Sequence, residues 1–394
     1  MKITLSKNND NFFINFITLY FFCESVNIFV DNYLGGFPYF DFLAKGILFV
    51  SLFVALMVVT IRSAIFTQFI IVEALIVLLL IITCLKGTSG AGFLKNSIYI
   101  LGIYVPIGVC TSAIQNKRRL LNSLYTIHIF PQILLILTMI CFNDGIFNYN
   151  MSASYALLLW TLIAIDHYFY EKRIVYDVII VLIDVAIILL KGARGPLVCV
   201  FAYIIMEMLF DNLELTRKKA MIITIITMGV FAFWGMYYTG VFKTFYSFLL
   251  NHGMQSRVLW TLSNDILYSS GRDTIYNRYL ELISNKPLTG YGLLGGRCDE
   301  LAQPHNSVLE TIFYFGIPGG LIFLVWYVIK IIKVFLKNRQ RDTSRLLLII
   351  IATLISTLIS NELFLTPYFY MGLAIIVGTE RDAGPVHDTI GMIN

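Results

Sequence analysis

The stretch HNSVLETIFYFGIPGGLIFLVWYVI, residues 305–329, decides the fold. After His305 and Glu310 it carries no charged or histidine side chain, and it is long enough to cross a bilayer, which takes roughly 20 apolar residues. The whole chain has this character, because 58% of its 394 residues are hydrophobic and only 13% are charged. A soluble chain of this length could not bury so much apolar surface. We therefore predict an all-α polytopic membrane protein.

Twelve apolar runs predict about twelve transmembrane helices, with residues 1–394 forming a single membrane domain. We place the spans near residues 12–30, 41–60, 66–85, 95–114, 123–141, 154–170, 174–190, 195–210, 220–239, 307–329, 345–361 and 366–380. Lys2 and Lys7 precede the first span, which we expect to serve as a signal anchor. The segment 240–306 is the one long connection, and we predict that it forms a large extracytoplasmic loop.

The basic residues separate into two sets. Eighteen of the 29 fall at the two ends and in alternate connections, so the positive-inside rule predicts that both termini are cytoplasmic. The other eleven then face outward: Lys45, Lys86, Lys95, Lys191, Arg194, Lys243, Arg257, Arg272, Arg278, Lys286 and Arg297. They are either ordinary solvated charges or a set that meets an anion. Arginine suits a diphosphate because its planar group binds two oxygens at once.

The segment SSGRDTIYNRYLELISNK, residues 269–286, predicts an amphipathic helix along the bilayer surface. A serine can cap its start and Pro287 ends it. Its apolar residues, which recur at helical spacing, are Ile275, Tyr279, Leu282 and Ile283. This helix either closes the membrane side of the loop or presents Arg272 and Arg278 at the level of the lipid headgroups.

The next segment, PLTGYGLLGG at residues 287–296, holds four glycines that permit tight turns and close backbone approach. It has neither the strand nor the lysine of a phosphate-binding P-loop. Taken alone, these glycines favour a structural turn.

His305 lies at the outer mouth of a predicted span, with Glu310 a little over one turn further on. A single histidine is usually structural, but this one also closes the arginine-rich loop. Cys298, Asp299 and Glu300 lie nearby, yet with His305 they match no known metal-binding spacing. We predict no metal and no cofactor.

The connection GARGP, residues 192–196, is so short that Arg194 must be held where two spans emerge. Asp184, on the preceding span, lies deep enough to need a partner or a polar cavity. Three further acids, Asp166, Asp177 and Glu207, fall near the cytoplasmic end, and we interpret them as interfacial.

Three motifs in order resemble the O-antigen polymerase and O-antigen ligase superfamily, which are membrane glycosyltransferases of the GT-C type. They are GARGPL at 192–197, SGRDTIYNRYLELISNKPLTGYG at 270–292 and HNSVLETIFYFGIPGG at 305–320. In that family a short outer loop carries an SRG-like element, and the large loop carries GR followed by PLxGxG. A final HN begins a span, with a glycine eleven positions after the histidine, as His305 and Gly316 are here.

The resemblance implies transfer of a glycan from an undecaprenyl diphosphate carrier to an acceptor hydroxyl. Arg194 and Arg272 correspond to the arginines of the two loop elements, and would stabilise the leaving diphosphate without a metal. His305 corresponds to the family histidine, and would act as the base. As residues that bind the diphosphate or the glycan we predict Arg257, Arg278, Arg297 and Glu310.

In a polymerase the acceptor is the sugar end of another lipid-linked repeat unit, whereas in a ligase it is lipid A core or a protein. Ala193 replaces the common serine and Val198 replaces a leucine frequent in ligases, which favours a polymerase of O-antigen or of a capsule or exopolysaccharide. The family implies a multi-pass protein of the bacterial cytoplasmic (inner) membrane with its large loop periplasmic or extracellular. Its expected partners are the lipid-linked oligosaccharide, membrane lipids, a chain-length regulator and a flippase, and no nucleic acid.

Two other classes fit the span pattern. A flippase for lipid-linked oligosaccharides would also have twelve spans with both ends inside. Transporters, however, usually place polar residues at the midplane of two related halves, whereas here charge gathers in one outer loop. A structural scaffold would leave the clustering of arginines and His305 unexplained.

Overall fold

The protein is seen in a computed structural model, and the structure describes residues 7–33, 64–87, 92–141, 150–171, 175–210, 231, 234–253, 255–264, 272–295, 304–337 and 341–382. These residues form helices, turns and loops without any strand. The α-helices are α1 (Lys7–Tyr33), α3 (Ala64–Leu85), α4 (Phe93–Tyr99), α5 (Val105–Ala113), α6 (Lys117–Ile127), α7 (Ile129–Cys141), α8 (Met151–Tyr170), α9 (Val175–Lys191), α10 (Arg194–Phe210), α12 (Val241–Asn251), α13 (Arg257–Asn264), α14 (Arg272–Asn285), α15 (Ser307–Lys337), α16 (Arg341–Ile355) and α17 (Pro367–Asp382). A π-helix, η1 (Ile100–Tyr104), joins α4 to α5, and a 3₁₀ turn, η2 (Ser356–Leu358), follows α16.

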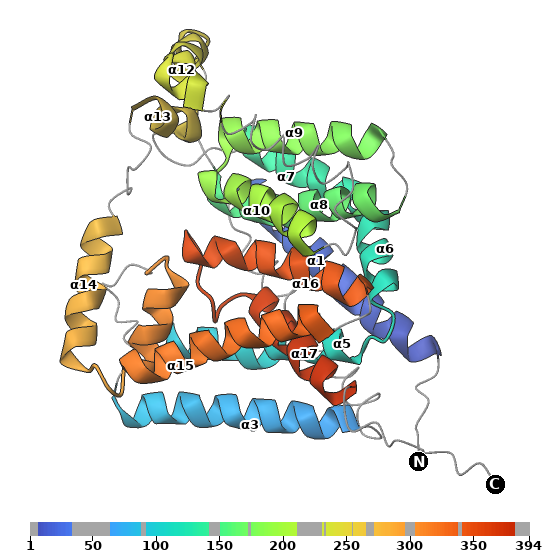
Figure 1. Cartoon of the computed structure of the whole chain (residues 1–394), viewed down its shortest axis with the longest axis vertical. Helices are drawn as coiled ribbons and strands as arrows, with labels where there is room; N and C mark the ends of the chain where they lie inside the picture. Colours follow the sequence, from blue (N-terminus) through green and yellow to red (C-terminus); the bar gives the residue numbers. More distant parts are fainter. Residues whose placement is uncertain are drawn as a thin grey trace.

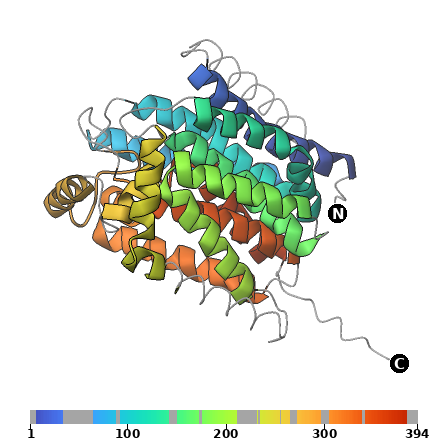
Figure 2. The same cartoon turned by 90° about the horizontal axis from the view of Figure 1, so that it is seen from above.

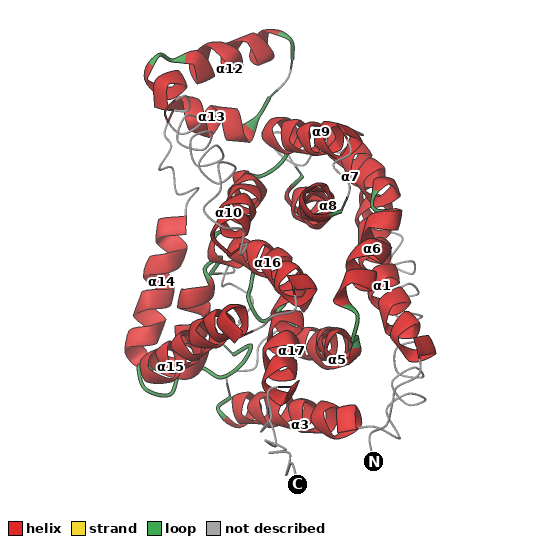
Figure 3. Ribbon diagram, turned by 45° about the vertical axis from the view of Figure 1, so that its right-hand side comes forward, coloured by secondary structure: helices red, strands yellow, loops and turns green. Residues whose placement is uncertain are grey.

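Helix α8 is the centre of the fold. It packs against α1, α6, α7, α9, α10 and α16, and Figure 3 shows it almost end-on among α7, α9, α10 and α16. It carries apolar side chains on every face, which is typical of a helix buried all round; Leu157, Trp160 and Ile163 are each at most 2% exposed. Seen from above, the green helices of this middle segment lie between the blue N-terminal and the red and orange C-terminal helices (Figure 2).

The described helices are those of a membrane protein. Three stretches are long and apolar enough to cross a bilayer, namely Asp10–Tyr33, Phe93–Ala113 and Ser307–Leu336, and the bent pair α6–α7 makes a fourth if it is one span. Large apolar side chains on outer faces, such as Ile71 at 61% and Ile322 at 71% exposed, suit contact with lipid. Twelve spans remain a prediction, since 41–60 and most of 220–239 lie outside the described residues.

One predicted span has different limits from those expected. The helix expected at 123–141 begins at Lys117 and bends by 51° at His128, between α6 and α7. Pro131 explains the bend, because it has no N–H for the carbonyl of Ile127 one turn earlier. Asn116 caps the new start by accepting from the Arg119 N–H at 3.1 Å.

A set of shorter helices crosses one end of the long ones. Figure 1 shows α3, α15, α16, α10 and α9 running across the molecule, with α14 standing to the left of α15 and α16 and with α12 and α13 above α14. The amphipathic helix predicted at 269–286 is therefore present as α14, and its expected capping serines lie outside the described residues. Its apolar face is covered by α15 instead of being left for lipid, since Tyr279 is buried and its ring lies 4.9 Å from that of Phe313.

Candidate active site

Arg272 and His305 meet at Ser360. The Arg272 guanidinium, at the start of α14, donates through Nη2 to the Ser360 hydroxyl at 3.1 Å. His305, just before α15, places Nδ1 2.6 Å from the Ser360 carbonyl oxygen. Ser360 is buried and follows the 3₁₀ turn, where its own N–H donates to the Ser356 carbonyl at 2.8 Å. Arg272 and His305 belong to two different sequence motifs, and both contact Ser360, which lies in a third segment of the chain.

The contact with Ser360 fixes the tautomer of His305. A carbonyl oxygen only accepts hydrogen bonds, so Nδ1 carries the proton and Nε2 keeps its lone pair. Burial lowers the pKa of His305, the hydrogen bond to Ser360 raises it, and the positive charge of Arg272 lowers it further, with a net lowering. The imidazole is therefore neutral at pH 7 and can accept a proton, as a general base must.

His305 also has a strained backbone. Its φ of 49° lies in the left-handed region, which is uncommon for a residue other than glycine. The next residue, Asn306, caps α15 by accepting from the N–H groups of Val308 and Leu309 at 3.0 and 3.1 Å. The capped helix and the Ser360 carbonyl together hold the imidazole in one place.

Glu310 holds the segment that follows Ser360 in place. It is fully buried in the first turn of α15, and its Oε2 accepts from the Leu363 N–H at 2.8 Å. Because Leu363 follows Ser360 closely, this bond fixes the segment that Arg272 and His305 contact. The structure thus gives Glu310 a structural contact, and its expected role in binding substrate stays a prediction.

The short connection between α9 and α10 is held against α8. The N–H of Ala193 donates to the Ser154 hydroxyl at 3.3 Å. A Cβ on Gly192 would lie 2.7 Å from the Ile188 carbonyl oxygen, and one on Gly195 would lie 1.9 Å from the Tyr155 hydroxyl. Gly192 therefore has no room for a side chain, and a side chain at position 195 would have to displace Tyr155. Arg194 begins α10 as the sequence predicts.

Arg194 and Arg272 share a neighbour in Tyr155. The Tyr155 hydroxyl, on α8, lies within electrostatic reach of both guanidinium groups and beside the Ser360 side chain. Arg272 therefore contacts the Ser360 that His305 also contacts, and Arg194 acts on the neighbouring Tyr155. A common catalytic role for the three residues stays a prediction.

The glycine-rich segment forms a turn that fits into a break in α15. Gly316 has φ 75° and ψ 170°, which interrupts the helix, and Pro318 offers no N–H. The carbonyls of Phe313 and Tyr314 are left without helical donors and accept from the N–H groups of Tyr291 and Gly292 at 3.0 and 2.8 Å. In return the Ile317 N–H donates to the Pro287 carbonyl at 2.7 Å. The turn therefore completes the backbone hydrogen bonding of the bent helix.

Lys86 secures the outer side of this turn. Its Nζ donates to the carbonyls of Thr289 and Gly290 at 2.7 and 3.3 Å. Desolvation lowers the pKa of Lys86, and the charge of Lys286 adds to the lowering. One of the basic residues predicted to face outward thus holds backbone carbonyls.

Two further arginines of the prediction, Arg257 and Arg278, lie elsewhere in the described part of the chain. Arg278 lies on the exposed face of α14 and pairs with Glu281 at 2.7 Å. Arg257 begins α13, next to Ser256, whose hydroxyl donates to the Leu189 carbonyl at 2.7 Å. Arg297 lies outside the described residues, as do the Cys298, Asp299 and Glu300 considered as metal ligands. Within the described residues no three His, Cys, Asp or Glu side chains lie close enough together to hold a metal ion.

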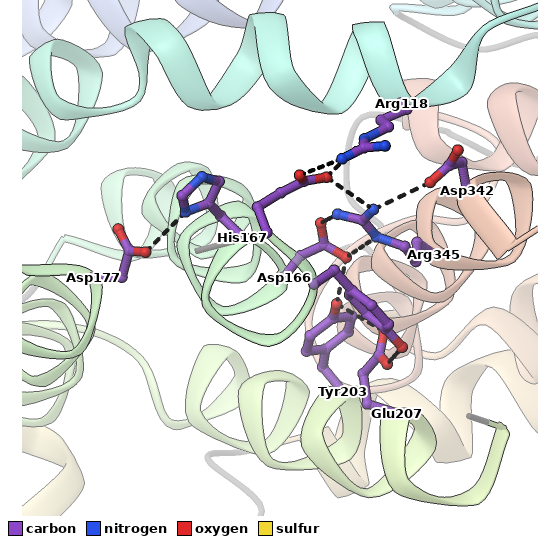
Figure 4. A network of polar contacts seen from close by, with 10 residues as sticks. Arg118, Asp166, His167, Asp177, Tyr203, Glu207, Asp342 and Arg345 are labelled. Atoms are coloured by element: carbon purple, nitrogen blue, oxygen red, sulfur yellow. Dashed lines mark hydrogen bonds and ion pairs between the residues drawn. The ribbon is translucent and has the colours of Figure 1, made fainter. Parts of the chain in front are cut away.

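A second polar cluster lies where α6, α8, α10 and α16 meet, on the side predicted to be cytoplasmic (Figure 4). Arg345, only 4% exposed, contacts Asp166 through Nε and Nη2 at 3.1 and 2.6 Å, and Glu171 through Nη1 at 3.4 Å. Arg118 also binds Glu171, and its hydrogen bond holds the pKa of that carboxyl below its usual range. These contacts tie the end of α8 to α6 and α16.

The other buried acids also have partners. Asp177 accepts from the Tyr125 hydroxyl at 2.7 Å and pairs with His167 at 2.9 Å, and Glu207 accepts from the Tyr203 hydroxyl at 2.9 Å. Asp166, Asp177 and Glu207, interpreted as interfacial from the sequence, are thus paired acids that are at most 5% exposed. Their position at the membrane interface stays a prediction.

The acid at position 184 has the partner that the sequence requires. Its Oδ2 accepts from the Gln132 amide at 2.8 Å and from the Thr161 hydroxyl at 2.9 Å.

Sequence reasoning missed Ser360 and Tyr155. Ser360 begins the polar run SNE at 360–362 between two apolar spans, and that run is a signal that could have been used. Tyr155 offers no signal, because it lies inside an apolar run and only packing reveals its neighbours.

A family model described as O-antigen ligase matches residues 179–324. No curated protein matches the chain. The matched region contains Arg194, Arg272 and His305, as well as the turn at 287–292 and the bend at Gly316. The match confirms, over this part of the chain, the resemblance predicted from the sequence motifs.

Proposed function

We propose that this protein is a polymerase of oligosaccharide repeat units in the bacterial cytoplasmic membrane. It transfers a glycan from an undecaprenyl diphosphate carrier to the sugar end of another lipid-linked repeat unit, outside the cytoplasm. The O-antigen ligase match supports a glycosyltransferase-type enzyme of glycan assembly. The choice of donor, acceptor and membrane is part of the proposal.

The observation that carries the proposal is the meeting of Arg272 and His305 at Ser360, with Arg194 nearby. A permanent cation beside a neutral imidazole suits a reaction that makes an anion and releases a proton. The two guanidinium groups would stabilise the leaving diphosphate, which removes the need for a metal.

The step balances with these groups. The acceptor hydroxyl oxygen bonds to the anomeric carbon of the donor sugar while the bond from that carbon to the diphosphate oxygen breaks. Nε2 of His305 takes the hydroxyl proton, and the electron pair of the broken bond stays with the diphosphate. The protonated imidazole then returns its proton to water.

A ligase is the second candidate, because the matching family model is described as O-antigen ligase. The same donor chemistry would then act on lipid A core or a protein. The two candidates differ in the acceptor, and therefore in which acceptor the purified protein uses.

The test uses the full chain, purified and placed in lipid nanodiscs with undecaprenyl-diphosphate-linked repeat units. A polymerase makes a ladder of longer lipid-linked glycans without any other acceptor. A ligase makes product only when lipid A core or an acceptor protein is added. The same protein is also placed in sealed vesicles. Movement of the lipid-linked glycan across the vesicle membrane, without either product, would show a flippase and overturn the proposal.

A further inference from the structure

Tyr155 has a buried hydroxyl that the proposed reaction does not yet use. Its oxygen is shielded from solvent and makes no hydrogen bond within the described part of the chain. The Ser360 side chain lies beside it, but the two hydroxyls do not meet in hydrogen-bond geometry. A buried donor without a partner destabilises the fold, so the place of this hydroxyl calls for an explanation.

The surroundings of this hydroxyl are positively charged. The charges of Arg272 and Arg194 both act on it, and Gly195 lets α10 approach it so closely that a Cβ there would lie 1.9 Å from the oxygen. A neutral phenol can donate one hydrogen bond. An anion held by the two arginines would be the natural acceptor.

We propose that the Tyr155 hydroxyl is the third donor of the diphosphate site, between Arg194 and Arg272. This inference rests on the proposed function, because it names a further residue for the same leaving group. The phenol donates to a diphosphate oxygen and keeps its own proton, so it assists the bond cleavage without exchanging a proton with the substrate.

Binding requires one local change. The hydroxyl is covered in this structure, while Arg272 is held by the neutral Ser360 hydroxyl. A charged acceptor forms hydrogen bonds roughly twice as strong as a neutral one. The diphosphate therefore draws Arg272 away from Ser360 and opens the way to Tyr155.

The decisive variant is Tyr155→Phe. It removes only the hydroxyl, which has no hydrogen bond in the protein as described, so thermal stability in nanodiscs is unchanged or slightly higher. Transfer from the lipid-linked donor falls on the order of a hundredfold in kcat, as for the loss of one oxyanion donor. If Tyr155 had a merely structural role, Tyr155→Phe would lower thermal stability and leave kcat unchanged.

Tyr327→Phe is a matched control. Tyr327, on α15, also has a buried hydroxyl without a hydrogen bond within the described residues, and it also lies against a glycine, Gly372. Unlike the Tyr155 hydroxyl, that hydroxyl feels no electrostatic interaction with an arginine of the described residues. The same substitution there leaves both transfer and binding unchanged.

Binding measurements identify the ligand chemistry. Undecaprenyl diphosphate, undecaprenyl monophosphate and inorganic diphosphate are each titrated into nanodiscs holding the wild type or a variant. We expect Tyr155→Phe to weaken undecaprenyl diphosphate binding about tenfold and to leave the monophosphate less affected. If inorganic diphosphate binds equally well and shows the same loss, the site recognises free diphosphate instead of the lipid-linked form.

The two proposals fail in different ways. A wild-type protein that binds undecaprenyl diphosphate but transfers no glycan overturns the proposed function. A wild type that transfers glycan while Tyr155→Phe matches it in kcat and in affinity overturns the role of Tyr155 and leaves the polymerase intact.

Discussion

Gly290 and Gly316 lie back to back, and neither has room for a side chain. A Cβ on Gly290 would lie 2.4 Å from the Gly316 nitrogen, and a Cβ on Gly316 would lie 2.4 Å from the Leu288 carbonyl oxygen. Gly316 also has a combination of φ 75° and ψ 170° that is essentially confined to glycine. The PLTGYG motif and the glycine after HN are therefore two halves of one contact.

Gly316→Ala should separate these halves. The strain of the backbone alone costs about 1–3 kcal/mol, and the clash with Leu288 adds to it. We expect a clearly lower melting temperature in nanodiscs and a loss of transfer. Gly378→Ala, in α17, is the control, because a Cβ there meets nothing within 4 Å. It should keep or slightly raise stability; an equal effect of both substitutions would contradict this account.

His305→Ala should abolish chain extension while membrane insertion is retained. The imidazole is the group with a free lone pair beside Arg272, so its loss removes the base. His252→Ala is a control in which an exposed histidine also uses Nδ1 to contact a backbone carbonyl, that of Phe248 at 2.8 Å. That variant should extend chains normally, as measured by the glycan ladder in nanodiscs.

The pH profile should report the state of His305. Its pKa is lowered in the folded protein, so the neutral form persists on acidification until the pH falls below the ordinary histidine value of about 6.5. We expect transfer to be constant at neutral pH and to decline only on that acidic side. A decline that begins above pH 7 would show that His305 is not the base that titrates.

Arg272→Ala should affect both rate and pH profile. Loss of the guanidinium removes a stabilising charge from the leaving diphosphate, which costs on the order of a hundredfold or more in kcat. It also removes a charge that lowers the pKa of His305, so the acidic decline of any residual activity should move to higher pH. Arg272→Lys keeps the charge and should restore the pH profile more than the rate, because lysine lacks the two-oxygen fork.

Arg194→Ala should likewise stop chain extension without preventing insertion. Arg194 begins α10 beside Tyr155 and acts on the same hydroxyl as Arg272. We expect wild-type amounts of protein in the membrane, measured by immunoblot, with loss of the glycan ladder. Normal ladders from this variant, together with normal ladders from the Arg272 and His305 variants, would end the proposed mechanism.

The Arg345–Asp166 pair should govern stability. Arg345→Met leaves the Asp166 carboxylate buried without its main cation, which costs about 3–5 kcal/mol. Arg345→Met combined with Asp166→Leu replaces the pair by apolar groups and should recover most of that loss. Arg118→Ala is the exposed counterpart, since the Arg118 side chain is 56% exposed, and it should cost much less stability than Arg345→Met. Equal losses from the three variants in thermal unfolding would contradict this account.

The sequence predicts the parts of the candidate site that depend on local constraint. The connection between α9 and α10 is so short that Arg194 must lie where the two helices meet, and Pro287 ends α14 as the pattern predicts. HN and the later glycine predict a helix start and a special backbone position, which are present at Asn306 and Gly316.

The parts that need packing could not be predicted. Ser360 is far from Arg272 and His305 in the chain, and only the return of the segment after α16 brings it to both. Periodicity says which residues of α14 share a face but not that α15 covers it. The bend at His128 depends on a single missing N–H at Pro131, which the hydrophobic pattern of 123–141 conceals.

The contact between the turn at 287–292 and the bent helix combines main-chain hydrogen bonds with the stacking of the Tyr291 ring on that of Phe313 at 4.6 Å. Leu288 and Thr289 are exposed, and their carbonyl oxygens face Gly316 and Lys86. Their side chains are accordingly positions where a fluorophore or spin label can be attached without disturbing the junction. Such a label would report, during turnover, whether the outer loop stays docked on the transmembrane segment or lifts away to admit each new glycan.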